Sequence, residues 1–285
     1  MKKLIQIEKG FTHAGKFHAD DVFSSALLTM LNPEIKIERG FEVPEAFDGI
    51  VFDIGMGEFD HHQQERRVRE NGIPYAAFGL LWETYGELIL SSEESVKFDE
   101  KFVQPLDLND NTGADNMLSD IISVFNPPWD YAVSSDGAFQ EAKELAITIL
   151  KKEFENIKSI KRAEHLVKKA IEKAEEHILI LPRSAPWKKY VKETELYFAI
   201  FPSNRGGYCA QGIPKDDNTD QLKCAFPKEW RGRVKEELKE LTSLETLQFC
   251  HNSGFLIATG TQEDAVEACK LAMKHQEELK EQENK

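Results

Sequence analysis

The sequence predicts an α/β protein built from two domains. In the first 110 or so residues, short apolar segments with strand character alternate with segments whose apolar residues follow a helical period, which is typical of a parallel sheet. At 285 residues the chain is longer than one small core requires. The segment NPPWDYAVSSDG at 126–137 combines two prolines with a polar tail and is the best boundary between the halves. We therefore expect a parallel-sheet N-terminal domain and a smaller, mixed α/β C-terminal domain.

The N-terminal half begins with a predicted strand, a loop and a helix. Residues 2–8 alternate weakly as a strand does, and residues 20–31 (DDVFSSALLTML) place apolar side chains at helical spacing. The acidic pair at 20 and 21 stands where a helix start favours carboxylates. The further elements predicted in this half are strands at 34–40 and 49–55, a helix at 75–90, and a polar loop followed by a helix at 91–113.

A charged, helix-compatible segment connects the two halves. Residues 138–176 contain neither proline nor glycine, which predicts one long helix or two. The elements predicted after it are strands at 177–182, 197–203, 207–214 and 247–259, a polar insertion at 215–233, and a terminal helix at 263–280. The expected domain limits are 1–130 for the first domain, 131–176 for a helical linker, and 177–285 for a substrate-binding α/β domain.

The acidic composition limits which partners the protein can bind. A net charge of −14 disfavours a broad platform for duplex DNA, because phosphate binding depends on Lys and Arg. A phosphate substrate stays open, since bound divalent cations invert the local field. The N-terminus is too polar for a signal peptide and no run approaches a membrane span. The four cysteines form no CxxC pair, so we expect reduced thiols and a cytoplasmic location.

Imidazoles and carboxylates gather in the first 110 residues. Four of the eight histidines lie there, each near an acidic residue and at a predicted loop or strand end. In parallel sheets, ligands bind at the carboxyl ends of the strands. The candidate metal ligands are His13, His18, Asp20, Asp53, His61, Asp107 and Asp110. The last two are three residues apart and share one face if their segment is helical.

The mixed nitrogen and oxygen donor set indicates which metals fit. It suits Mn²⁺, with Co²⁺ or Mg²⁺ as alternatives, better than a metal that prefers thiolates. So many donors exceed the need of one ion, and we expect two divalent cations, about 3.5–4 Å apart as in two-metal phosphatases and nucleases. The alternatives weighed here are solvated surface histidines and a structural zinc site. A zinc site needs only four ligands, often cysteines, and no cysteine lies nearby in the sequence.

Four segments in this order resemble the motifs of a known superfamily. THAGKFHADD, VFDIG, FDHHQ and LDLNDNTG are similar to the four motifs of the DHH phosphoesterases. The form HAGKFHADD, in place of the usual H-x-x-P-D-x-D, resembles the Myg (melanocyte proliferating gene) family. The later segments ILPRSAPW, GGYCAQGIP and FCHNSGFLIATGTQEDAVEACKLA agree with that family, so the resemblance covers nearly the whole chain. It implies a DHH-type N-terminal catalytic domain and an active site in the cleft between the two domains.

The resemblance also implies roles for the residues of the first three motifs. His13 and Asp20 match the histidine and the second aspartate of the first motif. His18 stands where that motif has its first aspartate, which keeps a ligand and removes one negative charge. Asp53 matches the aspartate that bridges two metals, and His61 matches a metal-binding histidine.

The remaining matches concern the substrate and the fourth motif. His62 matches a histidine that faces the substrate phosphate, and Asp60 would orient the histidine pair. Together with Asp53, these two are the expected catalytic residues. The aspartate of the fourth motif matches either Asp107, which follows the apolar residues, or Asp110, which has the better spacing to the glycine.

The second domain is expected to offer groups that hold the substrate. The first candidates are Arg183 and His251, near predicted strand ends. Arg205 and the turn at 252–254 are the weaker candidates. Trp187 and Trp230 could stack a base, although a place in the core is the ordinary position for a tryptophan.

The function expected is metal-dependent hydrolysis of phosphodiester bonds, in a 3′-to-5′ exonuclease or oligonucleotide phosphodiesterase acting on short RNA. The alternatives on the same scaffold are an inorganic pyrophosphatase and a cyclic-dinucleotide phosphodiesterase. The alternative from another class is a non-catalytic, metal-dependent nucleotide-binding module. The expected partner is a short oligonucleotide or a small phosphoanhydride, with neither duplex DNA nor a membrane, and a homodimer is left open.

Overall fold

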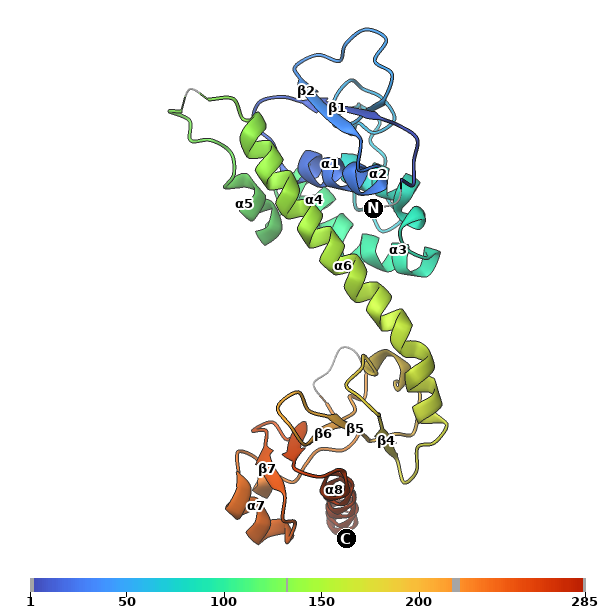
Figure 1. The fold of residues 1–285 in the computed structure, drawn as a ribbon, viewed down its shortest axis with the longest axis vertical. Coiled ribbons are helices and arrows are strands. Elements are labelled where there is room, and N and C mark those ends of the chain that lie inside the picture. Colours follow the sequence, from blue (N-terminus) through green and yellow to red (C-terminus); the bar gives the residue numbers. More distant parts are fainter. Residues whose placement is uncertain (1–2, 132, 217–220, 284–285) are drawn as a thin grey trace. The chain divides into compact units, whose positions relative to one another are not determined.

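The computed structural model describes residues 3–131, 133–216 and 221–283. The chain divides into two compact units, Met1–Lys158 and Ser159–Lys285, each with its own sheet. Figure 1 labels helices and strands of both units. The first sheet is parallel and the second is mixed, so the structure confirms the predicted α/β class. Over the described ranges, no helix combines the length and the apolar character of a membrane span.

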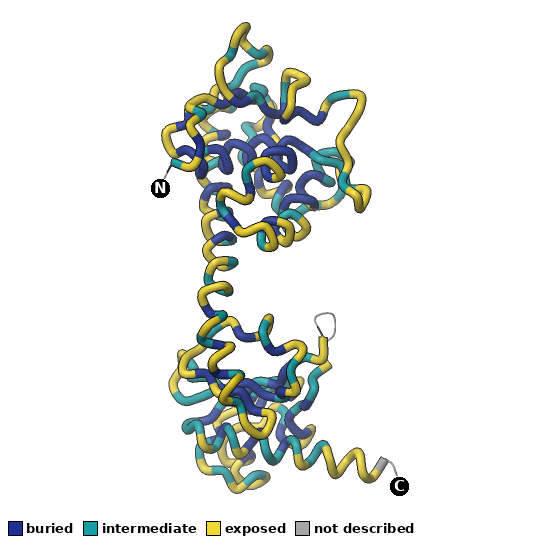
Figure 2. Tube along the Cα trace, turned by 90° about the vertical axis from the view of Figure 1, so that its right-hand side faces the viewer, coloured by how far each residue is buried: buried dark blue, intermediate teal, exposed yellow. Residues whose placement is uncertain are grey.

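Unit 1 consists of a small sheet covered by helices. Its elements before the last helix are β1 (Lys9–His13), α1 (Ala19–Leu31), β2 (Lys36–Gly40), β3 (Ile50–Val51), α2 (Ala77–Tyr85), η1 (Gly86–Leu88), α3 (Ser92–Phe98), the π-helical turn η2 (Asp99–Val103), α4 (Gln104–Thr112) and α5 (Met117–Ser123). The core is formed by apolar side chains of β3, α1, α2 and the following helices, and buried residues are dark blue in Figure 2. Nearly every residue of α1 is buried, so this helix lies at the centre of the unit.

The sheet of unit 1 has the strand order β2-β1-β3 and all its strands are parallel. His13, the last residue of β1, pairs with Gly40 at the end of β2. The first strand was predicted at 2–8, but the ladder begins only at Lys9, opposite Lys36. Residues 3–8 belong to no strand, and Ile5 packs into the core. The shift places His13 at the carboxyl edge of the sheet, where the chain leaves β1 for α1.

Helix α6 (Asp136–Ile171) contributes to the cores of both units. Its first half buries Phe139, Leu150 and Phe154 in unit 1, and its second half buries Val167 in unit 2. One continuous helix was among the two predicted forms of this segment. The division by packing falls inside this helix, whereas the three-part domain limits at 130 and 176 stay a prediction.

Unit 2 is a five-stranded mixed sheet with helices. Its elements are β4 (Ile178–Ile180), η3 (Lys188–Tyr190), β5 (Phe198–Pro202), β6 (Tyr208–Gly212), η4 (Lys228–Trp230), α7 (Lys235–Thr242), β7 (Leu247–Cys250), β8 (Leu256–Thr259) and α8 (Gln262–Glu283). The strand order is β4-β5-β6-β8-β7, in which only β4 and β5 are parallel. The strand predicted at 247–259 is a hairpin, because Ser253 and Gly254 turn the chain between β7 and β8.

The segment 215–233, predicted as a polar insertion, takes part in the core of unit 2. Cys224, Phe226 and Trp230 are buried there against the sheet and α8. Residues 217–220 of this segment lie outside the described residues. The insertion is therefore structural in its second half, where the sequence pattern suggested only polarity.

Candidate metal centre

Asp53 comes two residues after the apolar strand β3 and lies in the left-handed backbone region, with a φ of 56°. Aspartate is one of the few residue types that accept this conformation. The backbone N–H of Asp53 donates to the carbonyl of Phe59 at 2.9 Å, and Phe52 bridges to Phe59. These contacts fold the segment 54–58 into a tight turn, which brings the FDHHQ segment back beside the carboxyl end of β3.

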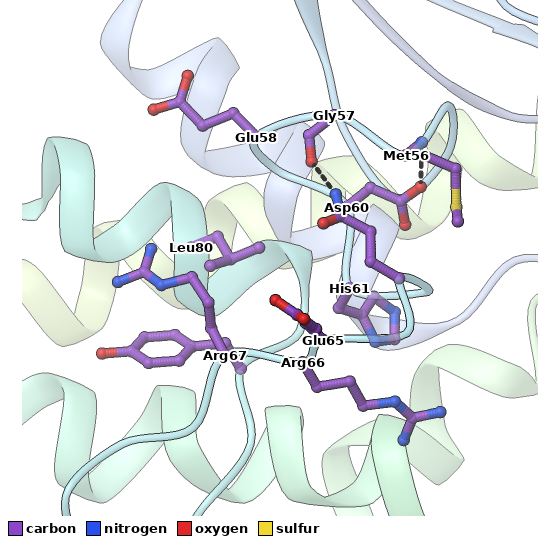
Figure 3. Close-up of a pocket in the computed structure, with 11 residues that line it drawn as sticks. Met56, Gly57, Glu58, Asp60, His61, Glu65, Arg66, Arg67 and Leu80 are labelled. Carbon is purple, nitrogen blue, oxygen red and sulfur yellow. Dashed lines mark hydrogen bonds between the residues drawn. The ribbon is translucent and has the colours of Figure 1, made fainter.

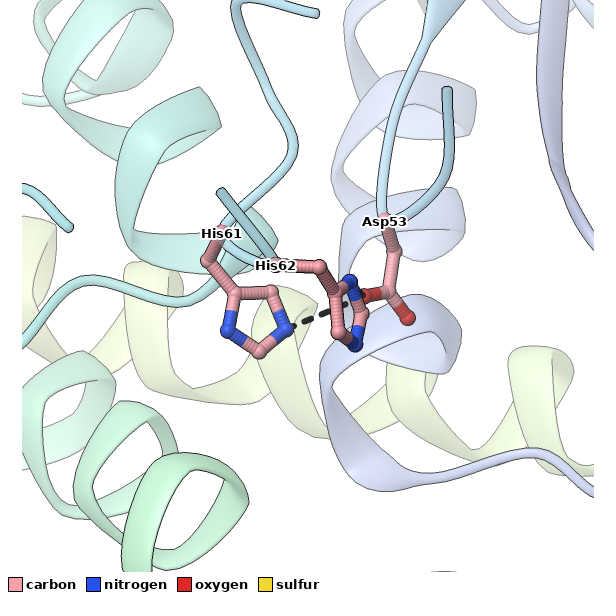
Figure 4. A group of neighbouring side chains, drawn as sticks. All are labelled: Asp53, His61 and His62. Carbon is pink, nitrogen blue, oxygen red and sulfur yellow. Dashed lines mark hydrogen bonds and ion pairs between the residues drawn. The ribbon is translucent and has the colours of Figure 1, made fainter. Parts of the chain in front are cut away.

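The Asp53 carboxylate lies between two histidines that are far apart in the sequence. Oδ1 is 3.1 Å from Nε2 of His61, and Oδ2 is 3.1 Å from Nε2 of His13. Figure 4 shows the contact with His61 and the neighbouring His62. Burial alone would raise the pKa of Asp53, but its hydrogen bonds with His13 and His61 lower the pKa to about 2. Burial alone would lower the pKa of His13, but Asp53 and Asp21 raise it to about 9.

Three groups of side chains around Asp53 could each hold a metal ion, since their ligand atoms lie within 4.8 Å of one another. These groups are His13, Asp21 and Asp53; Asp53, His61 and His62; and Asp20, His61 and Asp110. The distances of 3.1–3.2 Å between neighbouring donors match this purpose. Two donors at about 2.1 Å from one ion and at right angles to each other are about 3 Å apart. The donor set is imidazole and carboxylate, which fits divalent cations such as Mn²⁺.

Asp21 joins this cluster although the sequence did not single it out as a ligand. Its Oδ2 is 3.2 Å from Nε2 of His13, and Oδ1 accepts a hydrogen bond from the backbone N–H of His18. Oδ2 is buried and accepts no hydrogen bond from any described residue. Burial raises the pKa of Asp21 to about 7, against the charge of His13. A bound cation would relieve this buried charge. The signal in the sequence is the adjacent acidic pair at the helix start, of which only Asp20 was predicted as a ligand.

Asp20 has two roles in the geometry. Its carboxylate accepts hydrogen bonds from the first backbone N–H groups of α2, at 2.7 Å from Phe78 and 3.1 Å from Ala77. These are groups that a helix cannot satisfy internally. Burial and the charges of Asp53 and Asp110 raise the pKa of Asp20 well above its usual range. The residue therefore ties α1 to the start of α2 and reaches His61 and Asp110 as well.

The structure separates Asp107 from Asp110, which the sequence left as alternatives. Oδ2 of Asp110 is 3.2 Å from Nε2 of His61. Asp107 instead pairs with Nη2 of Arg69 at 2.8 Å and accepts a hydrogen bond from the backbone N–H of Gly79 at 3.1 Å. Among the described residues, Asp107 belongs to none of the three candidate groups. Asp110 is therefore the aspartate of this helix that reaches the cluster.

Asp60 orients the exposed His62. Its Oδ1 is 2.7 Å from Nδ1 of His62, and its Oδ2 accepts a hydrogen bond from the backbone N–H of Met56 at 2.7 Å. The second contact closes the turn after β3. His62 is exposed, with a side-chain accessibility of 58%, so its other ring nitrogen is available to a ligand.

His18 lies at the rim of the cluster. It precedes α1, is exposed, and its ring centroid is 6.2 Å from that of His13. His18 lines the same cavity as His13 and Asp110, but it joins none of the three groups among the described residues.

The comparisons with known proteins agree with the motifs that build this cluster. A model of the family described as "Uncharacterised protein family (UPF0160)", MYG1_exonuc, matches residues 9–273. This chain belongs to the MYG1 family. The MYG1 protein of Schizosaccharomyces pombe is 28% identical, over 96% of this chain and 98% of its own length. The Chlamydia trachomatis MYG1 protein is 30% identical over 93% and 96%, and the human MYG1 exonuclease 25% identical over 92% and 85%. No solved structure matches the chain.

In this MYG1 family member, two side chains hold the backbone of the loop between His13 and His18, and the sequence did not indicate these contacts. Arg39 donates to the carbonyls of His13 at 3.2 Å and Gly15 at 2.9 Å, and its side chain is nearly fully buried. Asn126 forms hydrogen bonds with both the N–H and the carbonyl of Phe17, at 3.0 and 2.9 Å. The segment at 126–137, which was read as a boundary, thus clamps the loop of the candidate metal centre.

Two neighbouring cavities open at the cluster. The first, of about 620 Å³, is lined by the clustered histidines with Asp53, Asp110, Lys16 and Arg66. The second, of about 450 Å³, is lined by Tyr75, Leu80, Arg67 and Glu65 among others and is drawn in Figure 3. Met56, Asp60, His61 and Arg66 line both. The clustered side chains are therefore accessible to a ligand larger than one phosphate group.

The residues predicted to hold the substrate in unit 2 lie at opposite ends of the strands of its sheet. Arg183 follows β4 and Arg205 lies in the turn between β5 and β6, so both are at the edge where Pro202 pairs with Tyr208. His251 follows β7 at the other edge, where Cys250 pairs with Ile257. The structure thus brings Arg183 and Arg205 to one end of the strands and His251 to the other. Trp187 and Trp230 are 4% and 7% exposed, so neither offers a free face for stacking.

Proposed function

We propose that this protein is a metal-dependent phosphoesterase that hydrolyses phosphodiester bonds. The observation that carries the proposal is the Asp53 carboxylate, whose two oxygens each face a different histidine within 3.1 Å. A carboxylate placed in this way can bridge two cations, as in two-metal hydrolases. The MYG1 relatives from rat, human and mouse carry the name exonuclease, which supports the same reaction class. The similarity of the motifs to the DHH phosphoesterases supports it as well.

The candidate groups suggest which residues would hold the cations. We assign His13, Asp21 and Asp53 to one ion and Asp20, Asp53, His61 and Asp110 to the other, with His18 at the rim. Two divalent cations, with Mn²⁺ as the proposed metal, would supply charge neutralisation at the phosphate and acidify a water molecule. Asp107 is assigned to the fold, because Arg69 and Gly79 occupy its carboxylate.

The protein's own groups would then bind the phosphate and steady its charge. Nδ1 of His62 donates to Asp60, so it is the imidazolium form of His62 that has an Nε2–H left to donate to a phosphoryl oxygen. Hydrolysis adds water across one P–O bond: the attacking oxygen binds phosphorus, the ester oxygen leaves, and the leaving oxygen takes up a proton. A donor placed where negative charge develops typically contributes several kcal/mol to such a step.

The substrate we propose is the 3′ end of a short RNA, cleaved in the 3′-to-5′ direction in the cytoplasm. The net charge of −14 favours a short end held at a local cation site over a long polyanion. The placement of the active site between the two domains stays a prediction.

A direct assay tests this function. The full-length protein with Mn²⁺ is given 5′-labelled short RNA, inorganic pyrophosphate and a cyclic dinucleotide in separate reactions. We expect progressive shortening of the RNA from its 3′ end and loss of this activity in Asp53→Asn. Asp115→Asn is the matched control. Asp115 is an exposed acid just after α4, the helix that carries Asp110, and it lies outside the candidate groups.

Each other outcome has a definite meaning. Full activity in Asp53→Asn would refute the assigned site. Faster turnover of pyrophosphate or the cyclic dinucleotide would replace the RNA assignment with that rival substrate. Turnover of none of the three would refute the enzyme and favour the nucleotide-binding module.

A further inference from the structure

Two basic side chains face the acidic cluster without an acidic partner. Lys16 and Arg66 line the same cavity as Asp53 and His62. Both are exposed, and neither forms a hydrogen bond or an ion pair with any residue in the described part of the chain. The chain has 50 acidic residues against 36 Lys and Arg, so unpaired cations beside a carboxylate cluster call for an external anion.

The backbone on both sides of Lys16 is held in place. The Gly15 carbonyl accepts hydrogen bonds from Arg39 at 2.9 Å and from the Ser135 hydroxyl at 2.7 Å. On the other side, Asn126 binds the N–H and the carbonyl of Phe17. An unpaired side chain on a fixed backbone is the arrangement expected of a binding group, because the backbone has little conformational freedom left to lose when a ligand binds.

Arg66 also extends from a fixed segment, and its neighbours show what pairing looks like there. Arg67 donates to Glu83 at 2.7 Å, and its carbonyl accepts a hydrogen bond from the backbone N–H of Tyr75. Arg69 is buried and holds both oxygens of Asp99, at 3.0 and 2.7 Å. Figure 3 shows Arg66 and Arg67 leaving the loop in opposite directions. Arg66 alone of these three arginines keeps its guanidinium for a ligand.

The position of Arg66 decides which phosphate it can reach. It lines both the cavity with the clustered acids and the neighbouring cavity of about 450 Å³. A phosphate at the cluster itself would be neutralised by the cations that the carboxylates hold. A rim arginine between two cavities is suited instead to the next phosphate along a chain, with the intervening nucleotide in the second cavity.

We infer that Lys16 and Arg66 form a clamp for the phosphates that flank the scissile one, so that the site prefers an oligonucleotide over a substrate with a single phosphate. This inference rests on the proposed function for the identity of the scissile bond. Arginine can bind such a phosphate through two hydrogen bonds, and lysine as a point charge. The clamp supplies the local positive charge that the acidic chain otherwise lacks.

Salt dependence is the readout that a purely structural role would not change. Each phosphate contact with single-stranded nucleic acid contributes about 0.7 to the slope of log Kd against log salt concentration. The Kd of a fluorescein-labelled phosphorothioate tetraribonucleotide is measured by anisotropy with Mn²⁺ present, at four salt concentrations. For Lys16→Gln and for Arg66→Gln we expect Kd to rise about 10-fold at low salt and the slope to fall by about 0.7 each.

Lys36→Gln is the matched control. Lys36 is an exposed lysine whose side chain has no partner among the described residues, and it begins β2, at the end of the strand pair opposite to His13. The Lys36→Gln substitution removes the same charge from the protein and should leave both the Kd and the slope as in the unsubstituted protein. Turnover adds a second comparison: Arg66→Gln should raise KM for the unmodified tetraribonucleotide and change the hydrolysis of bis(p-nitrophenyl) phosphate, which has one phosphate, less than 2-fold.

The outcomes separate the clamp from the proposed function. If the slopes of Lys16→Gln and Arg66→Gln match that of Lys36→Gln, the clamp is refuted. An equal loss on both substrates of the turnover assay would refute the assignment to flanking phosphates. A protein that binds the oligonucleotide with the expected slopes but cleaves nothing would refute the proposed function and keep the clamp. A protein that neither binds nor cleaves would refute both.

Discussion

Replacing Asp107 should lower the stability of the fold, whereas replacing Asp110 should lower the affinity for metal. Asp107 is fully buried, and its carboxylate is shared by Arg69 and the backbone N–H of Gly79. The Asp107→Ala variant leaves that N–H without an acceptor, at a cost of about 1–3 kcal/mol. It also removes one of the two acids around a buried guanidinium. Breaking a buried pair costs about 3–5 kcal/mol, and the lower end applies because Asp99 still holds Arg69. These two costs sum to about 4–6 kcal/mol. Burial raises the pKa of Asp107 to about 7, so removal of the carboxylate also relieves a desolvation cost. We therefore expect Asp107→Ala to lower the free energy of unfolding by about 3 kcal/mol.

Asp110→Ala should have the opposite profile. Burial and the charge of Asp53 raise the pKa of Asp110, so the carboxylate is not stabilised by its surroundings in the metal-free protein. Its removal should change the free energy of unfolding by less than about 0.5 kcal/mol. Because Asp110 is a proposed ligand beside His61, its replacement should lower the affinity for Mn²⁺ by at least about 10-fold.

Two measurements decide between these profiles. Urea unfolding in EDTA, followed by circular dichroism, reports the stability of each variant without metal. Titration with Mn²⁺, followed by electron paramagnetic resonance of the free ion, reports the affinity and the number of ions bound. The reasoning is refuted if Asp107→Ala unfolds like the unsubstituted protein but loses an ion, or if Asp110→Ala binds Mn²⁺ unchanged.

Three further predictions follow from contacts around the centre. Gly79→Ala should destabilise unit 1 by about 3 kcal/mol in urea, because a Cβ there would lie 1.9 Å from Oδ2 of Asp107. Arg39→Met should weaken Mn²⁺ binding about 10-fold by titration, since the Gly15 carbonyl loses its guanidinium donor and the loop is freed. Burial raises the pKa of Asp21 to about 7, so the metal-free fold loses stability as pH rises from 5 to 7.5 and this acid must ionise. The Tm gained on adding Mn²⁺ should therefore be larger at pH 7.5 than at pH 5.

Each of these has a result that would contradict it. A Gly79→Ala protein as stable as the parent would mean that the helix contact at this position is looser than the structure shows. Unchanged Mn²⁺ affinity in Arg39→Met would mean that the loop holds its shape without the guanidinium. The sign of the pH effect follows from a folded-state pKa above the unfolded value, so a Tm gain that is equal at both pH values would remove Asp21 from the cluster.

The convergence of the cluster could be predicted because it depends on short-range rules. His13 is the last residue of β1 and Asp53 comes two residues after β3, and parallel strands bring their carboxyl ends to one edge of the sheet. The FDHHQ segment is only a tight turn away from Asp53, so its histidines had to return nearby. The strand–loop–helix order of residues 9–31 was likewise readable from apolar periodicity, although the first strand began later than predicted.

The features that the sequence did not reveal depend on long-range partners. Nothing local shows that Arg69 occupies Asp107 and leaves Asp110 to the cluster, since both aspartates lie on one helix three residues apart. Asp21 looked like an ordinary acid at a helix start until its contact with His13 was visible. The order of antiparallel strands in unit 2 is also not encoded locally, so the separation of Arg183 from His251 required the structure.

Helix α6 limits where the protein can be divided, because it supplies core residues to both units. A fragment that stopped before residue 136 would lose Phe139, Leu150 and Phe154. Trp82, which stacks on Phe154, and Phe98, which meets it edge-on, would then be exposed to water. A fragment that began after residue 171 would strip Val167 from the other hydrophobic core. Neither half can therefore be exchanged, shortened or inherited as a self-contained module unless its own turns of that helix travel with it.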